Sequence, residues 1–137
     1  MIQVLLADDH HFVRSSVADL LMATGDITVV AECADGSEVL AAALRTQPEV
    51  VLMDLAMPHR TGLEATQDLL DAGVPSRVVL LTGSFSAASV REARALGAAG
   101  YVLKDDDPAA LPQLVRDVAS GGSAWCARAA GSLLGVG

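Results

Sequence analysis

Three carboxylates stand at the ends of two apolar runs in this chain. Asp8 and Asp9 follow the run at residues 2–7, and Asp54 follows the run at residues 50–53. In an open parallel sheet, side chains just past the carboxyl ends of neighbouring strands converge on one crevice, so three acids placed there could share a divalent cation. The residue types therefore predict a site that binds a metal ion and handles phosphate.

Two further polar residues end apolar runs later in the chain. Thr82 follows residues 78–81, and Lys104 follows residues 101–103. A hydroxyl and an ammonium group opposite three carboxylates suit an anionic ligand whose charge a cation offsets, and a phosphoryl group with Mg²⁺ fits that pattern. Taken singly, Thr82 could cap the next helix, Lys104 could be a solvated charge, and the acids could complement helix dipoles. The joint occurrence of all five at strand ends favours the site.

Short apolar runs alternate along the chain with longer stretches of helical period. We expect strands at residues 2–7, 27–33, 49–53, 77–81 and 99–103, with one-faced helices starting near Val13, Val39, Leu63, Val90 and Leu111. Near-continuous apolar strands that alternate with helices predict a parallel sheet covered on both faces. The expected fold class is α/β, a doubly wound five-stranded parallel sheet of order 2-1-3-4-5 (flavodoxin-like), whose switch point lies between the first and third strands.

Capping patterns place several helix starts. Asp35 with Glu38, and Thr61 with Glu64, match the pattern in which a cap side chain and an acid three residues later satisfy free backbone N–H groups. The pair 107–108, Asp-Pro, also resembles a helix start, but the proline at position 112 would delete a bond one turn later. The last helix is therefore expected to begin after residue 108.

Composition and charge limit the classes of function. The 137 residues suit one domain, and the net charge of −8 comes without a Lys/Arg cluster, so the chain alone is not expected to bind DNA. Cys33 and Cys126 lie far apart without metal-ligand spacing, which favours reduced, buried thiols and a cytoplasmic location. No basic leader and no apolar run of about 20 residues is present, so no membrane association is expected.

Four segments, in this order and spacing, carry a resemblance to a known family: LLADDHHFVR, VVLMDLAMPHRTGLEA, VVLLTG and GAAGYVLKD. From residue 1 to about residue 120 the chain resembles the receiver domain of bacterial two-component response regulators. The Asp-Asp-His start, the Gly-Tyr-Val-Leu-Lys-Asp segment and the Gly-Gly-Ser-Ala-Trp ending resemble the NarL/FixJ group, whose members usually append a LuxR-type helix-turn-helix. We therefore expect a receiver domain at 1–120. Residues 121–137 are expected to form a linker or a short helix over 127–134, with the output domain absent from this chain.

The resemblance implies a role for each residue of the expected site. Asp54 would accept a phosphoryl group from a partner histidine kinase, with Mg²⁺ held by Asp8, Asp9, Asp54 and the backbone carbonyl of Ala56. The Thr82 hydroxyl, the Gly83 backbone N–H and Lys104 would bind the phosphate, and Thr82 and Tyr101 would form the switch. The clustered carboxylates should also repel one another and raise the pKa of at least one.

The function implied is a signalling domain, not an enzyme: it would catalyse only its own Mg²⁺-dependent phosphorylation and dephosphorylation. Phosphorylation would switch homodimerisation or output, in transcription regulation, with DNA bound only through an output domain. The alternative is a stand-alone or phosphorylation-independent receiver that acts as a protein-interaction module. A flavin-binding module would need a hydroxyl- and glycine-rich phosphate loop after the first strand, and an aspartyl phosphatase typically has an Asp-x-Asp pair on that strand. The chain has neither.

Several positions leave local questions open. His59 stands where the family usually has glycine, and Asp105 stands where some receivers have proline, so either isomer of the 104–105 peptide bond is possible. His10 and His11 could be metal ligands, but the neighbouring hard carboxylates favour a surface helix start. Ala56 and Ser84 are small residues at the two positions where the family tunes the access of water to the acyl phosphate, so the resemblance implies a fairly open site.

Overall fold

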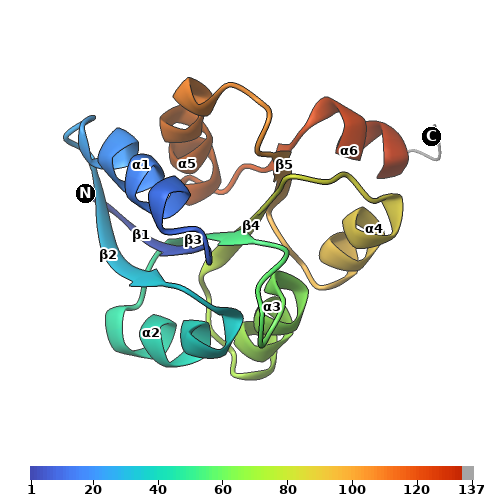
Figure 1. Cartoon of the computed structure of the whole chain (residues 1–137), viewed down its shortest axis with the longest axis horizontal. Coiled ribbons are helices and arrows are strands. Elements are labelled where there is room, and N and C mark those ends of the chain that lie inside the picture. The colour runs from blue at the N-terminus through green and yellow to red at the C-terminus, as the bar shows by residue number, and fades with distance from the viewer. Residues whose placement is uncertain (134–137) are drawn as a thin grey trace.

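A parallel sheet of six strands forms the centre of the structure, a computed structural model that describes residues 1–133 (Figure 1). The strands are β1 Ile2–Ala7, β2 Ile27–Cys33, β3 Val50–Asp54, β4 Arg77–Thr82, β5 Gly100–Leu103 and β6 Ala124–Trp125. Their order is β2-β1-β3-β4-β5-β6, and every pair is parallel. The predicted fold class, the first five strands and their order are confirmed. The sixth strand was missed because two residues show no periodicity.

Residues 1–133 also contain six α-helices and two short 3₁₀ turns, and all of them except the last helix lie between strands. The helices are α1 His11–Met22, α2 Val39–Thr46, α3 Gly62–Asp71, α4 Ala87–Ala95, α5 Leu111–Ala119 and α6 Ala127–Leu133, and the 3₁₀ turns are η1 Gly36–Glu38 and η2 Pro108–Ala110. Helix α6 falls in the segment expected to form a short helix or linker, and residues 134–137 of that segment lie outside the described residues. Within residues 1–133, no helix is long and apolar enough to span a bilayer.

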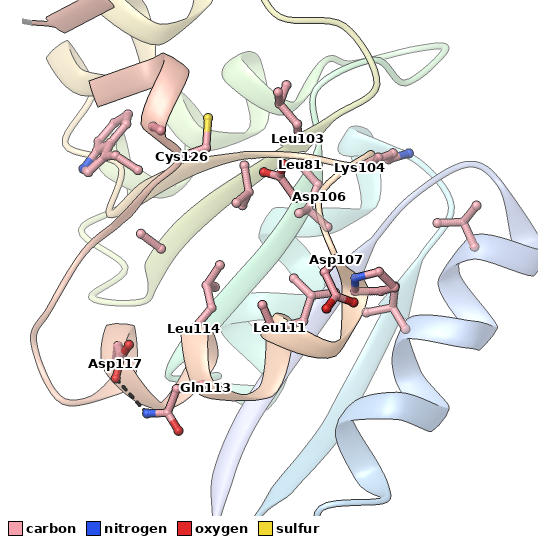
Figure 2. A pocket seen from close by; sticks show the side chains of 18 of the residues that line it. Leu81, Leu103, Lys104, Asp106, Asp107, Leu111, Gln113, Leu114, Asp117 and Cys126 are labelled. Atoms are coloured by element: carbon pink, nitrogen blue, oxygen red, sulfur yellow. Dashed lines mark hydrogen bonds between the residues drawn. The ribbon is translucent and has the colours of Figure 1, made fainter. Parts of the chain in front are cut away.

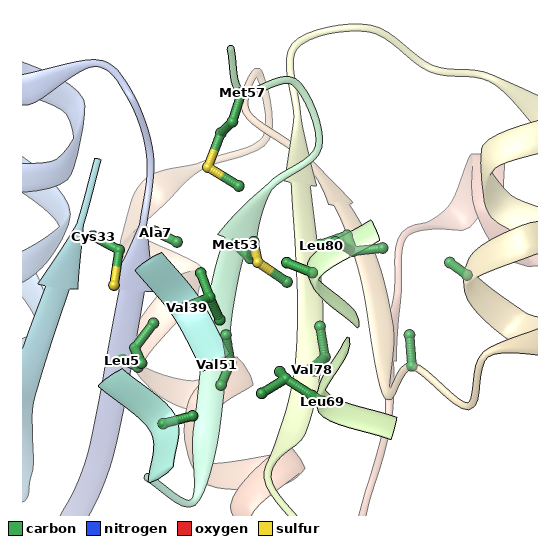
Figure 3. Packing of buried hydrophobic residues seen from close by; sticks show 14 of the residues in the cluster. Leu5, Ala7, Cys33, Val39, Val51, Met53, Met57, Leu69, Val78 and Leu80 are labelled. Carbon is green, nitrogen blue, oxygen red and sulfur yellow. The ribbon is translucent and has the colours of Figure 1, made fainter. Parts of the chain in front are cut away.

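Both faces of the sheet are buried because helices cover each face (Figure 1). On one face, Val4, Leu6 and Leu52 pack with residues of α1 and α5, including Leu21 and Val115. On the other face, strand residues pack with α2, α3 and α4, and Ala129 of α6 joins the same cluster. Figure 3 shows this second core, in which the side chains of Leu5, Val51 and Leu80 meet Val39 and Leu69. The alternation of strands and helices in the sequence thus produces three layers.

Two of the three predicted helix starts have the expected form. Thr61 Oγ1 accepts from the Glu64 N–H at 3.2 Å, and a Glu64 carboxylate oxygen accepts from the Thr61 N–H at 3.0 Å, so this capping box is confirmed. Helix α5 begins after the 3₁₀ turn η2, as the two prolines predicted. At Asp35 the helix start is confirmed, because Asp35 caps the 3₁₀ turn η1, which runs directly into α2, but the box is not formed, because Glu38 accepts from the N–H of Ala34.

The structure shows the isomer of the peptide bond at residues 104–105 and the state of the two cysteines. All peptide bonds of the described residues are trans, including the bond between Lys104 and Asp105. Cys33 and Cys126 are both free; Cys33 is buried, as expected, whereas Cys126 is partly exposed. Burial raises the pKa of the Cys33 thiol to about 11, so this thiol is protonated at neutral pH.

Candidate functional site

The polar residues singled out in the sequence gather at the carboxyl edge of the sheet. Asp54 and Thr82 are the last residues of β3 and β4, while Asp8 and Lys104 directly follow β1 and β5. These four strands are consecutive neighbours in the sheet, so the side chains at their ends are brought together by strand pairing alone. Asp8, Asp54 and Thr82 are buried, with 5%, 4% and 5% exposure.

Four potential metal ligands form a compact cluster at this edge. One ligand atom from each of Asp8, Asp9, His10 and Asp54 lies within 4.8 Å of the others, and Asp9 and His10 are exposed. The cluster is therefore open to solvent on one side. The three carboxylates are hard oxygen donors of the kind that Mg²⁺ prefers, so the donor set fits that ion.

His10 is largely exposed but contacts both acids of the Asp8–Asp9 pair. As expected, it precedes α1 and its side chain is 66% exposed. Its backbone N–H also donates to Asp8 Oδ1 at 2.8 Å, and its Nδ1 atom lies 3.2 Å from Asp8 Oδ1 and 3.2 Å from Asp9 Oδ1. The imidazole thus bridges the acid pair, a contact that adjacency in the sequence did not reveal.

Lys104 connects two of the acids. Its Nζ atom donates to Asp8 Oδ2 at 2.9 Å and to Asp54 Oδ2 at 2.9 Å. Burial alone would lower the pKa of Lys104, but the hydrogen bonds and charges of the two carboxylates more than offset it, and the pKa is raised. Lys104 is therefore a charged partner of the acids, and the alternative of a free, solvated surface charge does not hold.

Asp54 is destabilised in its ionised form. Burial raises the pKa of its carboxyl group, and the charge of Asp8 adds to the rise. The hydrogen bond and charge of Lys104, and the N–H of Ala56 at 3.3 Å, lower the pKa but do not cancel the effect of burial. The raised pKa expected from repulsion among carboxylates is present, but its larger cause is loss of solvent.

This raised pKa predicts that Asp54→Asn stabilises the metal-free protein at neutral pH. In the native chain the folded state holds the Asp54 proton more tightly than the unfolded state does. The stability from protonation is therefore present below the ordinary pKa of 3.8 and is lost as pH rises through the raised value. Urea unfolding in EDTA from about pH 4 to about pH 8 should show the variant gaining on the native chain over this window. Parallel stability curves for the two proteins would contradict the prediction.

The loop after β4 lies beside the acids. Thr82 Oγ1 donates to the Ser84 carbonyl at 2.9 Å and accepts from the Ser84 N–H at 3.1 Å. Helix α4 is capped by Ser86, which accepts from the Ser89 N–H, so the alternative in which Thr82 caps that helix does not hold. Gly83, Ser84 and Ala56 are exposed, and this loop and the one after β3 form an open rim.

Tyr101 points into the protein. It is fully buried, its hydroxyl accepts from the Ser86 N–H at 3.3 Å, and its ring meets Phe85 edge to face at 6.2 Å between centroids. The guanidinium of Arg128, on α6, lies 4.2 Å from the centroid of the Phe85 ring. Phe85, in the loop after β4, therefore contacts both Tyr101 and the last helix, α6. No pattern in the sequence indicated Phe85 or Arg128 as partners.

A groove of about 780 Å³ opens beside the site (Figure 2). It lies between α1, α5 and the segment after α5, with Lys104 at its edge, Leu81 behind it and Leu111 and Leu114 along its wall. On α1, the groove-lining Phe12 is 84% exposed. The groove places an apolar surface directly next to the acid cluster.

The fold and the residues at its carboxyl edge define a doubly wound α/β domain with a lysine-bridged acid cluster. The family model described as the response regulator receiver domain matches residues 4–116, so the chain belongs to the receiver domain family. The resemblance seen in the four sequence segments is thereby confirmed.

Two of the relatives are named as regulators of this kind. The DNA-binding transcriptional activator DevR/DosR of Mycobacterium tuberculosis is 36% identical over 98% of this chain and 62% of its own length. The nitrate/nitrite response regulator NarP of Escherichia coli is 36% identical over 92% of this chain and 59% of its own length. The chain thus spans less than two thirds of either relative.

Solved structures agree with this assignment. The receiver domain of the response regulator NarL from Mycobacterium tuberculosis is 32% identical, covers 88% of this chain and 97% of its own, and has a TM-score of 0.84. A LuxR-family response regulator from Aurantimonas sp. is 32% identical, covers 97% and 95% of the two chains, and has a TM-score of 0.90. The similarity to the NarL/LuxR branch predicted from the sequence is confirmed.

Proposed function

We propose that this chain is a phosphoacceptor domain in which Asp54 receives a phosphoryl group from a histidine of a sensor kinase. The proposal depends above all on one contact, the 2.9 Å hydrogen bond of Lys104 Nζ to Asp54 in a pair that also includes Asp8. A carboxylate is a weak nucleophile, so a fixed cation beside it is needed to offset the charge of an incoming phosphoryl group.

The transfer exchanges one bond for another. An oxygen of Asp54 bonds to phosphorus while the bond from phosphorus to the donor imidazole nitrogen breaks, and the released imidazole takes up a proton. The product is an aspartyl phosphate. Lys104 offsets charge on the phosphoryl oxygens, and the Thr82 hydroxyl and the Gly83 N–H bind them. Before transfer the Thr82 hydroxyl donates a hydrogen bond to the Ser84 carbonyl, so it must give up this bond in order to bind the phosphate.

Asp8, Asp9 and Asp54, with the carbonyl of Ala56, are the residues that would hold Mg²⁺. When bound, the ion supplies positive charge next to the transferring oxygens. The hard oxygen donors and the open side at Asp9 support this part of the proposal.

Phosphorylation would change the conformation of the domain through Thr82 and Tyr101. A rearrangement of the loop that ends at Ser86 would move the buried Tyr101 ring, because the Ser86 N–H is hydrogen-bonded to the Tyr101 hydroxyl.

In this proposal, residues 1–120 form the receiver, residues 121–137 link it to an output domain, and phosphorylation promotes homodimerisation and regulates transcription. As a cytoplasmic signalling domain it catalyses only its own Mg²⁺-dependent phosphorylation and dephosphorylation.

Intact-mass spectrometry with a small acyl phosphate donor tests the proposal. The native chain is expected to gain one phosphoryl group with Mg²⁺, and none in EDTA. Asp54→Asn should gain none under either condition because it lacks the nucleophile.

Asp71→Asn provides a matched control, because it removes a carboxylate from the far end of α3. This variant should behave as the native chain does. A native chain that stays unmodified would contradict the proposal. Such a result, combined with specific binding of a partner protein, would favour a phosphorylation-independent interaction module.

A further inference from the structure

Asp35 joins two loops that are distant in the sequence. It lies in the turn after β2 and is 6% exposed. One carboxylate oxygen, Oδ2, accepts from the Ser37 N–H at 2.9 Å and so caps η1. The other oxygen, Oδ1, accepts from the His59 N–H at 2.9 Å, in the loop between β3 and α3. One side chain therefore serves both its own turn and the loop that follows Asp54.

The turn and the loop also fit closely at the backbone. A Cβ atom placed on Gly36 would lie 2.1 Å from the carbonyl oxygen of Arg60, so only glycine allows this approach. Hydrogen bonds from Ser37 and His59 hold the pKa of Asp35 well below its usual range, although burial alone would raise it. The carboxylate is thus ionised at neutral pH and is a strong acceptor.

The loop that Asp35 contacts contains Ala56, whose carbonyl is the expected ligand of Mg²⁺. Its two ends are fixed, because the Leu55 N–H donates to the Leu81 carbonyl at 3.0 Å and the Gly62 N–H donates to the Leu55 carbonyl at 2.8 Å. Ala56 lies between these ends, and its N–H donates to Asp54. The bond from Asp35 to His59 reaches the loop three residues after Ala56, so it restricts the directions in which the Ala56 carbonyl can point.

We propose that Asp35 is a positioning residue for the metal site, which orients the Ala56 carbonyl through the backbone of the loop at His59. This inference rests on the proposed function, because it assumes that the Ala56 carbonyl and the acid cluster bind Mg²⁺ together. Groups that orient metal ligands without touching the metal commonly change metal affinity by about 10- to 100-fold when they are removed.

Asp35→Ser separates the two roles of the side chain. Serine is a good cap and keeps an acceptor for the Ser37 N–H, but it is too short to reach His59. Glu38→Ala is the matched control. It removes the bond of Glu38 to the Ala34 N–H in the same turn and leaves the bond from Asp35 to His59 in place. Asp35→Ser thus keeps the cap of the turn and frees the loop, whereas Glu38→Ala weakens the turn and leaves the loop held.

Mg²⁺ titrations followed by amide chemical shifts give the dissociation constant and report folding in the same spectra. The expected result is that Asp35→Ser raises the dissociation constant about 10-fold, while Glu38→Ala leaves it unchanged. At saturating Mg²⁺ the phosphorylation rate of Asp35→Ser should return to the native rate. A purely structural role would lower thermal stability without shifting the Mg²⁺ titration.

Two outcomes distinguish this inference from the proposed function. If the native chain itself shows no Mg²⁺-dependent shifts, the proposed function fails. If the native chain binds Mg²⁺ and Asp35→Ser binds it equally well, the role of Asp35 is overturned and the proposed function stands. Should Asp35→Ser not fold, Asp35→Asn decides. In that variant one carbonyl oxygen replaces two carboxylate oxygens, and the amide shift of His59 shows whether its hydrogen bond is lost; unchanged Mg²⁺ affinity with that bond lost overturns the inference.

Discussion

Replacement of Lys104 by methionine is expected to slow phosphoryl transfer to Asp54 about 10²- to 10³-fold, the usual cost of removing one fixed electrostatic partner from a reacting centre. The same variant should bind Mg²⁺ more tightly than the native chain. In the structure the ammonium group contacts one oxygen of Asp8 and one of Asp54. Its removal leaves both carboxylates with an uncompensated negative charge that favours a divalent cation.

Opposite changes in rate and affinity are the signature of this role. The rate is measured as the time course of the phosphorylated mass at saturating Mg²⁺, and the affinity by titration of amide shifts. Arg45→Met is the matched control, because Arg45 lies in the last turn of α2, at the opposite edge of the sheet. A Lys104→Met variant that reacts at the native rate would contradict the assignment. So would one that loses rate and Mg²⁺ affinity together.

Mg²⁺ is expected to stabilise the folded protein strongly. At a concentration of about 100 times the dissociation constant, a ligand specific for the folded state adds about 2.7 kcal/mol to the free energy of unfolding. For a domain of this size the melting temperature should then rise by roughly 5 to 15 °C. The physical reason is that the ion offsets the mutual repulsion of Asp8, Asp9 and Asp54, whose ligand atoms lie within 4.8 Å of one another.

Thermal melts at matched ionic strength, with Mg²⁺ or with NaCl, check this expectation. Asp9→Asn removes one ligand and should reduce the shift sharply. The shift should also shrink as pH falls through the raised pKa of Asp54, because protons and Mg²⁺ compete for the same carboxylate. No shift in the native chain, or an equal shift in Asp9→Asn, would be incompatible with a magnesium site at this cluster.

The order of the strands and the location of the site could be predicted from the sequence because both depend on local patterns. Apolar runs such as residues 2–7 predict buried strands by themselves, and the topology of parallel sheets then brings Asp8 and Asp54 to one edge. The capping box at Thr61 was equally accessible, because both of its partners lie within three residues of each other.

Contacts between distant segments were not accessible in this way. The bridge from Asp35 to His59 spans 24 residues, and nothing in either segment indicates the other. Asp35 matched a capping pattern with Glu38 and does cap its turn, but the bond of its second oxygen to the loop after β3 was not indicated by that pattern. The stacking of Arg128 on Phe85 was inaccessible for the same reason. The raised pKa of Asp54 was expected, but its main cause, burial, became visible only in the folded structure.

The most direct test of the proposed function is to locate the phosphoryl group on the chain. The native protein is phosphorylated with a small acyl phosphate donor and Mg²⁺, the acyl phosphate is reduced with borohydride, and the digest is mapped by mass spectrometry. One reduced residue is expected, at Asp54, and none when Mg²⁺ is removed with EDTA. Modification at Asp8, Asp9 or His10, or a digest with no reduced residue, would contradict it.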